Sequence, residues 1–491
     1  MKNINSHRVF HRNQKEPDTG GKYVVYWMQS AHRLHYNFAL EYAVGWANKL
    51  DKPLLLYEEL KNDYPWASDR IHTFYLEGMQ EIRDYCREHN HNYLSFVEEE
   101  PETNKRAYLE MLRNACCLVT DEFPVYFIRE RNRWLGEHLD IPVYTVDNNG
   151  LIPLGLTEKD PYNAYFFRKI MQRNFVEAYT HPPKQNPLEE LKNREEIDIK
   201  SLRKKLPTRG EIPEEIPKFI NELPIDHEVK PLEIKGTRQA ALGKLGRFVQ
   251  YGLPEYDEKR NDPDESKVSG LSPWLHFGKI SEHEIVQTVL DHQPKGWDLG
   301  DISFNKGSTG GFFNGDPNID GFLDEVITWR EVGFHFAHHR PDYAEFESLP
   351  DWALETLRDH KDDPREWIYS YEELENAQTH DEIWNAAQRQ LRQEGIIHNY
   401  LRMLWGKKVI EWTPDPQTAL EYLIELNNKF AIDGRDPNSY SGIFWCFGRF
   451  DRAWQERPIF GKVRYMTSKS TRRKVKLKKY LDRFGDQQAL L

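Results

Sequence analysis

The chain has 491 residues, of which 38% are hydrophobic and 13% aromatic. That length and composition allow two or three domains with large cores and exclude a disordered chain. The formal net charge is −12 at pH 7, so overall charge does not indicate a nucleic-acid partner. Residues 457–485 are nevertheless strongly basic, a bias that suits either a phosphate-binding surface or a solvated helix face.

The cysteines and the hydropathy pattern indicate the cellular compartment to expect. Cys86, Cys116, Cys117 and Cys446 lack the spacing of a metal site, so we expect reduced thiols in the core and no bound metal. There is no signal-peptide pattern and no apolar run long enough to cross a bilayer. We therefore expect a cytoplasmic protein, free or associated with DNA, that does not act at a membrane.

The first third of the chain alternates between two periodicities. Five short apolar runs are separated by stretches with helical spacing, and they occupy residues 23–28, 53–57, 93–97, 116–120 and 142–146. This order predicts an α/β domain with a five-stranded, mostly parallel sheet. Neither a GxGxxG nor a Walker A sequence follows the first strand, so the usual nucleotide-binding fingerprints are absent.

The middle of the chain reads as a connection. Residues 181–235 are rich in proline and charge, which suits a path over a surface. Helical patterns then continue to the end of the chain, interrupted by the Gly- and Asn-rich stretch 304–321. We predict an α/β domain over 1–180, a linker over 181–235 and a helical domain over 236–491.

The stretch "NYLRMLWGKKVIEW", residues 399–412, has apolar groups on more than one side and therefore predicts a buried helix. Trp405 and Trp412 are seven residues apart, so both indoles lie on one face. Arg402, one turn after His398, needs a polar partner because an unpaired buried charge is costly. Asp433 of "DGRDPNSYSGIFW" is a natural partner, although an ion pair alone would be ordinary structural pairing.

"SGLSPWLHFGKIS" has the pattern of a helix start, with Ser272 as the N-cap and a proline at the first helical position. A helix N-terminus beside the hydroxyls of Ser269 and Ser272 can receive a phosphate or diphosphate. Most helix starts of this kind bind nothing except their own backbone.

Several long motifs occur in order along the second domain: "SGLSPWLHFGKIS", "DEVITWRE", "THDEIWNAAQRQL", "GIIHNYLRMLWGKKVIEWTPDP" and "LNNKFAIDGRDPNSYSGIFW". With them the chain resembles the photolyase/cryptochrome superfamily, and most of all the class II cyclobutane pyrimidine dimer photolyases. The resemblance extends more loosely to "KYVVYWMQSAHRLHYNFALEYA" in the first domain. It implies an α/β antenna domain followed by an all-α catalytic domain that binds FAD.

The resemblance also implies roles in cofactor binding. The FAD diphosphate is expected near the "SGLSP" helix start, Asn427 beside flavin N5, and Arg402 with Asp433 beside the ring system. The implied FAD-binding residues are Tyr256, Ser269, Leu271, Ser272, Arg402, Asn427 and Asp433. An electron-transfer chain is expected to run from Trp405, nearest the flavin, through Trp384 to Trp412 toward the surface. A second, antenna chromophore of the deazaflavin or folate type is a further expectation, although no motif marks its pocket.

The implied substrate is UV-damaged DNA, bound by a monomer. The residues expected to contact the pyrimidine dimer are Arg260, Glu325, Trp329, Met403 and Trp445. Two tryptophans give flat walls for a flipped-out pyrimidine pair, and methionine gives an adaptable contact. Glu325 can accept a base N–H or donate a proton, and Arg260 supplies a cation for DNA.

The function implied is a light-driven lyase that splits cyclobutane pyrimidine dimers by electron transfer from excited, reduced FAD. Three alternatives stay open: a cryptochrome-like FAD photoreceptor, a photolyase for the (6-4) photoproduct, and a relative that has lost catalysis. The second would use nearby histidines, and His398, His335, His338 and His339 are available. The chain departs from the class II pattern at "WREVGFHFAHHRPDY", at a shorter "CFGRFDRAW", and at an apparent insertion over 291–321.

Overall fold

The computed structural model describes residues 4–99, 108–206, 211–292, 297–313 and 315–485. The chain divides by compactness into two units. The first consists of Met1–Glu158, Asn174–Gly246 and Leu271–His292, and the second of Lys159–Arg173, Arg247–Gly270 and Gln293–Leu491. The three consecutive ranges expected from the sequence stay a prediction about domains. Part of the expected insertion, 293–296 and 314, lies outside the described residues.

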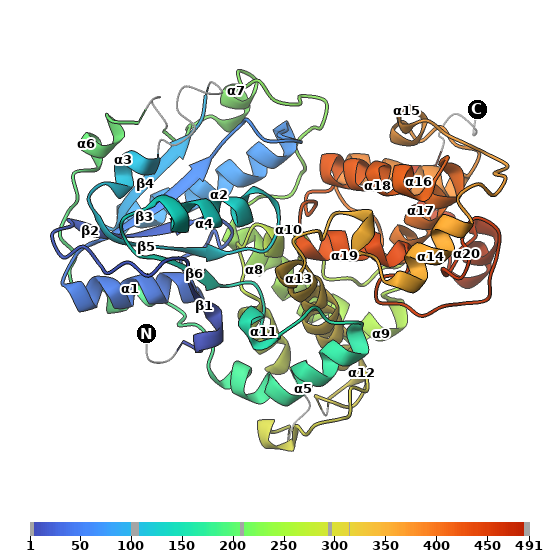
Figure 1. The fold of residues 1–491 in the computed structure, drawn as a ribbon, viewed down its shortest axis with the longest axis horizontal. Coiled ribbons are helices and arrows are strands. Elements are labelled where there is room, and N and C mark those ends of the chain that lie inside the picture. The colour runs from blue at the N-terminus through green and yellow to red at the C-terminus, as the bar shows by residue number, and fades with distance from the viewer. Residues whose placement is uncertain (1–3, 100–107, 207–210, 293–296, 314, 486–491) are drawn as a thin grey trace. The chain divides into compact units, whose positions relative to one another are not determined.

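The first unit contains a sheet whose strands are coloured blue to teal in Figure 1. Its order is β1-β6-β5-β2-β3-β4. The strands are β1 (Val9–His11), β2 (Tyr23–Met28), β3 (Leu54–Leu60), β4 (Asn92–Val97), β5 (Ala115–Glu122) and β6 (Val143–Asp147). The five expected strands are confirmed and are parallel, but the count of five is wrong, because β1 pairs antiparallel with β6. Three residues are too few to show a strand periodicity.

The sheet is covered on both faces, as its fully buried strands β2, β5 and β6 require. Along β2, Val24, Tyr26 and Met28 enter one core, which includes residues of α1 (Phe38–Leu50) and α2 (Asp69–Glu88). The alternate residues of β2 enter the opposite core, with residues of α3 (Tyr108–Leu112), α4 (Tyr126–His138) and α6 (Ile199–Arg203). The period-two alternation of the strand thus gives a doubly wound α/β arrangement.

The proline-rich stretch after α5 (Ala164–Thr180) follows this first unit closely. Asn92 Oδ1 accepts the backbone N–H of Ile197 at 2.9 Å, and Leu202 of α6 is buried beside β4. The remaining helices of this unit are α7 (Ile216–Ile220), α8 (Arg238–Arg247), α10 (Ser272–His276) and α11 (Glu282–Leu290). The stretch is therefore an anchored surface segment with buried apolar residues.

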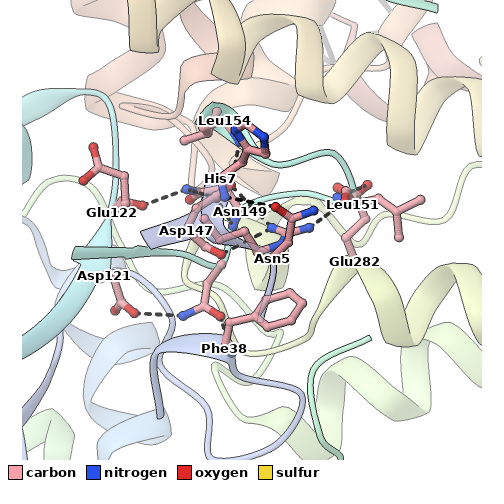
Figure 2. A network of polar contacts seen from close by, with 12 residues as sticks. Asn5, His7, Phe38, Asp121, Glu122, Asp147, Asn149, Leu151, Leu154 and Glu282 are labelled. Carbon is pink, nitrogen blue, oxygen red and sulfur yellow. Dashed lines mark hydrogen bonds and ion pairs between the residues drawn. The ribbon is translucent and has the colours of Figure 1, made fainter. Parts of the chain in front are cut away.

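A polar network ties down the chain after β6, and Figure 2 shows it from close by. Asp147 accepts the backbone N–H groups of Asn149 and Leu154, each at 2.9 Å. The buried guanidinium of Arg8 donates to the Leu151 carbonyl oxygen at 2.5 Å and lies 4.4 Å from the centre of the Phe38 ring. These bonds satisfy buried polar atoms and rigidify the loop.

The second unit is mostly helical, so the predicted fold class of an α/β part followed by a helical part is confirmed. Its helices are α9 (Tyr256–Lys259), α12 (Pro317–Leu323), α13 (Arg330–His339), α14 (Asp351–Asp359), α15 (Tyr371–Glu375), α16 (Glu382–Glu394), α17 (Asn399–Trp412), α18 (Pro416–Phe430), α19 (Pro437–Cys446), α20 (Ser468–Lys474) and α21 (Lys478–Phe484), with a π-helical segment η7 (Asp324–Trp329) before α13. In the described parts of the chain, no helix is both long and apolar enough to cross a membrane.

Three of these helices begin at an Asp-Pro pair that is visible in the sequence. Asp316, Asp415 and Asp436 each accept a backbone N–H of the first turn, at 2.7 to 2.9 Å, and the following proline occupies the start of the helix. The side chain satisfies one of the free N–H groups, and proline needs none there. These starts fix where α12, α18 and α19 begin.

Candidate functional site

The five side chains expected to contact the pyrimidine dimer, Arg260, Glu325, Trp329, Met403 and Trp445, all lie in the second unit and are all half-buried. We refer to them as the half-buried cluster. Arg260 donates to Glu325 Oε1 at 3.0 Å, and Glu325 and Trp329 share the π-helical turn η7. Single π-helical turns occur frequently at functional sites. The cluster has the partial exposure that a binding surface needs.

Trp329 and Trp445 form a stacked pair. Their ring centres are 4.7 Å apart and their planes differ by 11°. The pair joins η7 to α19, and Gly333 allows α13 and α19 to lie close together, since a Cβ there would be 2.7 Å from Ser441 Oγ and 2.9 Å from the Pro437 carbonyl oxygen. Each indole therefore has one covered face, so a pyrimidine can stack only on an outer face unless the pair separates.

The Glu325 carboxyl has an unusual acidity. Burial, reinforced by the nearby Asp324 carboxylate, raises the pKa of Glu325 to about 7, although the Arg260 guanidinium opposes the change. Solvent still reaches 35% of the side chain, so the carboxyl can exchange its proton with water. At neutral pH the group is divided between its protonated and ionised forms, and it can donate or accept a hydrogen bond.

A buried ion pair holds the π-helical turn η7 in place. Arg168 of α5 donates to both carboxylate oxygens of Asp324, at 2.6 and 2.9 Å, and both side chains are buried. Bidentate pairing is the strongest geometry for such a bond. It fixes the residue directly before Glu325. Sequence reasoning missed Arg168, because its partner is 156 residues away and no local pattern connects them.

Asp433, expected beside the flavin ring, and His398, named for the (6-4) alternative, have buried polar atoms without partners in the part of the chain that the structure describes. Asp433 Oδ1 is buried and has no hydrogen-bond partner among the described residues, and the same is true of both ring nitrogens of His398. The expected ion pair between Arg402 and Asp433 is not among those formed in the described parts of the chain. Buried polar atoms are nearly always paired, so these atoms mark a place suited to a polar ligand.

Asn427 lies near the end of α18 with its side chain held in place. Its amide donates to Ser439 Oγ at 2.9 Å and to Asn428 Oδ1 at 3.3 Å. The turn that carries Asp433 packs tightly against this end of α18, because a Cβ on Gly434 would be 2.9 Å from the Asn427 carbonyl oxygen. Asn427 and Asp433 are therefore rigidly placed residues of neighbouring elements.

The predicted phosphate-binding segment is divided between the two units. Tyr256 and Ser269 belong to the second unit, whereas Leu271 and Ser272 belong to the first. The assignment of Ser272 as N-cap is wrong: α10 begins at Ser272, its N-cap is Leu271, and no side chain caps it. A serine before proline is compatible with either position. The Tyr256 hydroxyl is buried, which raises its pKa well above the ordinary value.

Trp405, Trp384 and Trp412, which we call the tryptophan ladder, are all buried. The Trp384 indole N–H donates to the Trp405 carbonyl oxygen at 3.0 Å, and the Trp384 and Trp412 rings are 5.7 Å apart between centres. Trp405 donates its own indole N–H to Gln388 Oε1 at 2.9 Å. The expectation that Trp412 faces the surface is wrong, because the side chain is only 2% exposed.

The basic end of the chain borders a groove of about 850 Å³. Its lining includes five cationic side chains from α20, α21 and the residues between them: Arg472, Arg473, Lys474, Lys476 and Lys478. Glu382, Asp264 and Asp482 also line it, so its charge is mixed. The sequence had left a phosphate-binding surface and a solvated helix face equally open, and the groove favours the first.

The fold resembles that of a known protein structure. No family model matches the chain. The solved structure of a bacterial class III photolyase from Agrobacterium tumefaciens superposes with a TM-score of 0.65 over 96% of this chain and 86% of that one, at 19% sequence identity. The fold is thus that of the photolyases.

Curated relatives cover nearly the whole chain. A deoxyribodipyrimidine photo-lyase of Methanothermobacter thermautotrophicus is 34% identical over 98% of both chains. Those of Potorous tridactylus and Arabidopsis thaliana are each 31% identical, covering 92% and 93% of this chain and 79% and 88% of their own. The chain belongs to the deoxyribodipyrimidine photo-lyase family.

Proposed function

We propose that this lyase repairs UV-damaged DNA with light by splitting cyclobutane pyrimidine dimers, in the manner of the class II photolyases, with FAD as its cofactor. The observation that carries the proposal is the chain of contacts through four residues of the half-buried cluster, all except Met403. Arg260 contacts Glu325, Glu325 shares η7 with Trp329, and Trp329 stacks on Trp445. A cation, a carboxyl group of adjustable protonation and flat aromatic faces are the groups that a flipped-out pyrimidine pair requires.

The residues present fit FAD. The buried, unpartnered Asp433 Oδ1 and His398 nitrogens would supply polar contacts to the cofactor, as would Arg402, which is half-buried in the first turn of α17. Asn427, held by Ser439, would face the flavin ring, and Tyr256, Ser269, Leu271 and Ser272 would contribute near the diphosphate. Held by these residues in its reduced form, FAD would supply light-driven electron transfer to the cyclobutane ring, with no net redox change.

The chain's own residues position the substrate. Trp329 and Trp445 offer aromatic faces for the pyrimidines, and Met403 gives an adaptable apolar contact. Glu325 hydrogen-bonds the bases, and Arg260 together with the groove of α20 and α21 holds the DNA backbone. All of these contacts come from one chain, so a monomer is sufficient to bind the DNA. We place the protein in the compartment that holds its DNA substrate. An antenna chromophore of the deazaflavin or folate type would belong to the first unit, where strand order reverses between β2 and β5.

His398 bears on the alternative of (6-4) photoproduct repair. Burial lowers the pKa of His398 to about 4, with only a partial opposing effect of Asp262. At pH 7 this lowered pKa favours a neutral imidazole at His398. His335, His338 and His339 are the other histidines of that alternative, so the repair assay with each lesion decides between them. A cryptochrome-like photoreceptor would need no dimer-binding surface, and the half-buried cluster favours the lyase.

The proposal is tested by an anaerobic repair assay. Purified protein with reduced FAD is mixed with an oligonucleotide that carries one cyclobutane thymine dimer, and the return of thymine absorbance is followed in blue light and in the dark. Light-dependent recovery is expected. A parallel oligonucleotide with a (6-4) photoproduct should stay unchanged. Bound, photoreducible FAD with no repair of the first substrate would instead support the photoreceptor or a relative that has lost catalysis.

Replacing Arg260 by Ala is expected to raise the Kd for dimer-containing DNA about tenfold, because one charge-assisted contact is lost. The slope of log affinity against log salt should also fall by about one, as one phosphate contact disappears. Electrophoretic mobility or fluorescence anisotropy measures both quantities, while flavin absorbance confirms that FAD stays bound.

The matched control for Arg260 is Arg358→Ala. Arg358 belongs to the same unit but makes an exposed ion pair, at 3.7 Å, with Glu347, which is not a residue of the half-buried cluster. Its loss should leave both the Kd and the salt slope unchanged. Equal behaviour of the two variants would remove the DNA-binding role of Arg260.

Glu325 should make repair depend on pH. With its pKa near 7, the carboxyl keeps its proton below that pH and loses it above. As a proton donor to the bases, it should give a repair rate that falls as pH rises through 7, measured with pre-reduced enzyme between about pH 5 and pH 9. Glu325→Gln, which always donates, should flatten this step, whereas Glu347→Gln should keep it. A step that persists in Glu325→Gln would assign it to another group.

A further inference from the structure

The buried Trp412 has a tyrosine as its outer neighbour. The ring centres of Tyr369 and Trp412 are 5.5 Å apart, with planes at 76°. The Tyr369 backbone N–H also donates to the Trp412 carbonyl oxygen at 3.0 Å, which ties the segment before α15 to the end of α17. Trp412 itself has little contact with water, so an electron hole that reaches it needs a further donor to move outward.

The hydroxyl of Tyr369 is placed to lose a proton. The His380 backbone N–H donates to Tyr369 Oη at 3.0 Å, and the same oxygen lies 2.7 Å from His380 Nδ1. Because the hydroxyl carries one proton and already accepts from the backbone, it donates that proton to Nδ1. The remaining imidazole proton is then on Nε2. The phenol thus has a base within one short hydrogen bond.

His380 connects this pair to solvent. Its side chain is exposed, and its ring stacks on Trp367, with centres 4.5 Å apart and planes at 24°. Trp367 is 45% exposed. A protonated imidazole is stabilised by the face of an indole, and it can release its proton to water.

The surroundings of Trp412 favour movement of positive charge away from it. Lys408 Nζ lies 5.2 Å from the centre of the Trp412 ring, although its charge is partly offset by Glu411, 2.7 Å away. A neighbouring cation disfavours a radical cation on the indole. A neutral radical on Tyr369 leaves the indole uncharged, and the positive charge passes to the His380 ring, whose centre is 5.2 Å from that of Trp412 and which reaches solvent.

We propose that Tyr369 is the terminal electron donor of the tryptophan ladder, with His380 as its proton acceptor. The inference rests on the ladder of the proposed function. With photoexcited, oxidised flavin as the oxidant, Trp412 is left one electron short. Tyr369 then gives Trp412 an electron and gives His380 Nδ1 its phenol proton, which leaves a neutral tyrosyl radical and an imidazolium. A thiol from solution restores the phenol by hydrogen-atom transfer, and the imidazolium loses its extra proton to water.

The test follows radicals directly in the FAD-loaded protein. After a flash, transient absorption and electron paramagnetic resonance distinguish a tyrosyl radical from a tryptophan radical. The wild type should show the tyrosyl signal and Tyr369→Phe should lose it, with a tryptophan radical that decays by return of the electron. The matched control is Tyr371→Phe, because the Tyr371 ring packs on Tyr422, 5.4 Å away, rather than on Trp412. It should behave as wild type.

A second variant tests the proton. In wild type the re-reduction of the Trp412 radical should slow in deuterated water, and His380→Asn should slow it further and remove the isotope effect. A tyrosyl signal that survives in Tyr369→Phe would overturn the assignment, as would a wild type that shows only a tryptophan radical while photoreduction still depends on Trp405. Photoreduction that is independent of Trp405 would overturn the ladder itself, and this terminal step with it.

Discussion

Replacing Trp405 by Phe is expected to slow photoreduction of oxidised FAD by more than about tenfold, a change that needs only ~1.4 kcal/mol in barrier height. Phenylalanine is much harder to oxidise than tryptophan, so the first step of the ladder is interrupted. Enzyme that has already been chemically reduced should still repair its substrate at nearly the wild-type rate. Flavin absorbance recorded after timed periods of illumination measures the rate of photoreduction. The repair assay measures the rate of the pre-reduced enzyme.

A suitable control is Trp274→Phe. Trp274 is also buried, and its indole N–H makes one hydrogen bond of the same 2.9 Å length, to the Lys235 carbonyl oxygen. Each substitution should cost about 1–3 kcal/mol of stability through the lost bond and the smaller ring. Only Trp405→Phe should affect photoreduction. Equal photoreduction in both variants would exclude Trp405 from the electron path.

Replacing Arg168 by Ala is expected to lower the free energy of unfolding by about 3–5 kcal/mol, because the buried Asp324 carboxylate is left without its partner. The uncompensated charge lies directly before Glu325 and should raise the pKa of Glu325 further, since Asp324 already acts in that direction. Denaturant unfolding followed by circular dichroism measures the stability loss, and the pH profile of repair should shift upward.

The double variant Arg168→Ala/Asp324→Asn separates the ion pair from simple packing. Removing both charges should recover much of the stability lost in Arg168→Ala, since no buried charge remains unpaired. Arg168→Lys should recover less, because lysine cannot donate to both carboxylate oxygens in parallel. No recovery in the double variant would mean that the contacts of the arginine side chain, rather than its charge, hold η7.

Sequence patterns predicted the fold where the determinants are local. The strands β2 to β6 were predicted from apolar runs bounded by polar turns. The Asp-Pro pairs at the starts of α12, α18 and α19 are local signals of the same kind, although they were not used for prediction. β1 was missed because its three residues pair with β6 across more than 130 residues of chain. The interleaving of the two units was equally hidden, because compactness depends on contacts that are distant in sequence.

For the functional site, too, some features could be predicted from the sequence and others could not. The resemblance to known motifs named Glu325, Trp329 and Trp445 as dimer contacts, yet it gave no sign that Trp329 and Trp445 stack on each other. Charge complementarity suggested that Arg402 pairs with Asp433, whereas Asp433 Oδ1 is buried without a partner in the described chain. The resemblance also placed Trp412 toward the surface, whereas its burial, which the helical pattern did predict, includes contact with Tyr369 outside α17.

The way the chain passes between the two compact units limits how the protein can be dissected. Because residues 159–173, 247–270 and 293–491 form the second unit, no single cut separates a complete first unit from a complete second one. A fragment ending at residue 246 would lack 271–292, including Gly278, whose carbonyl oxygen accepts from Arg33 at 3.0 Å. Truncations aimed at an isolated antenna or catalytic half should therefore aggregate, and point substitutions in the full-length chain are the sounder route to its photochemistry.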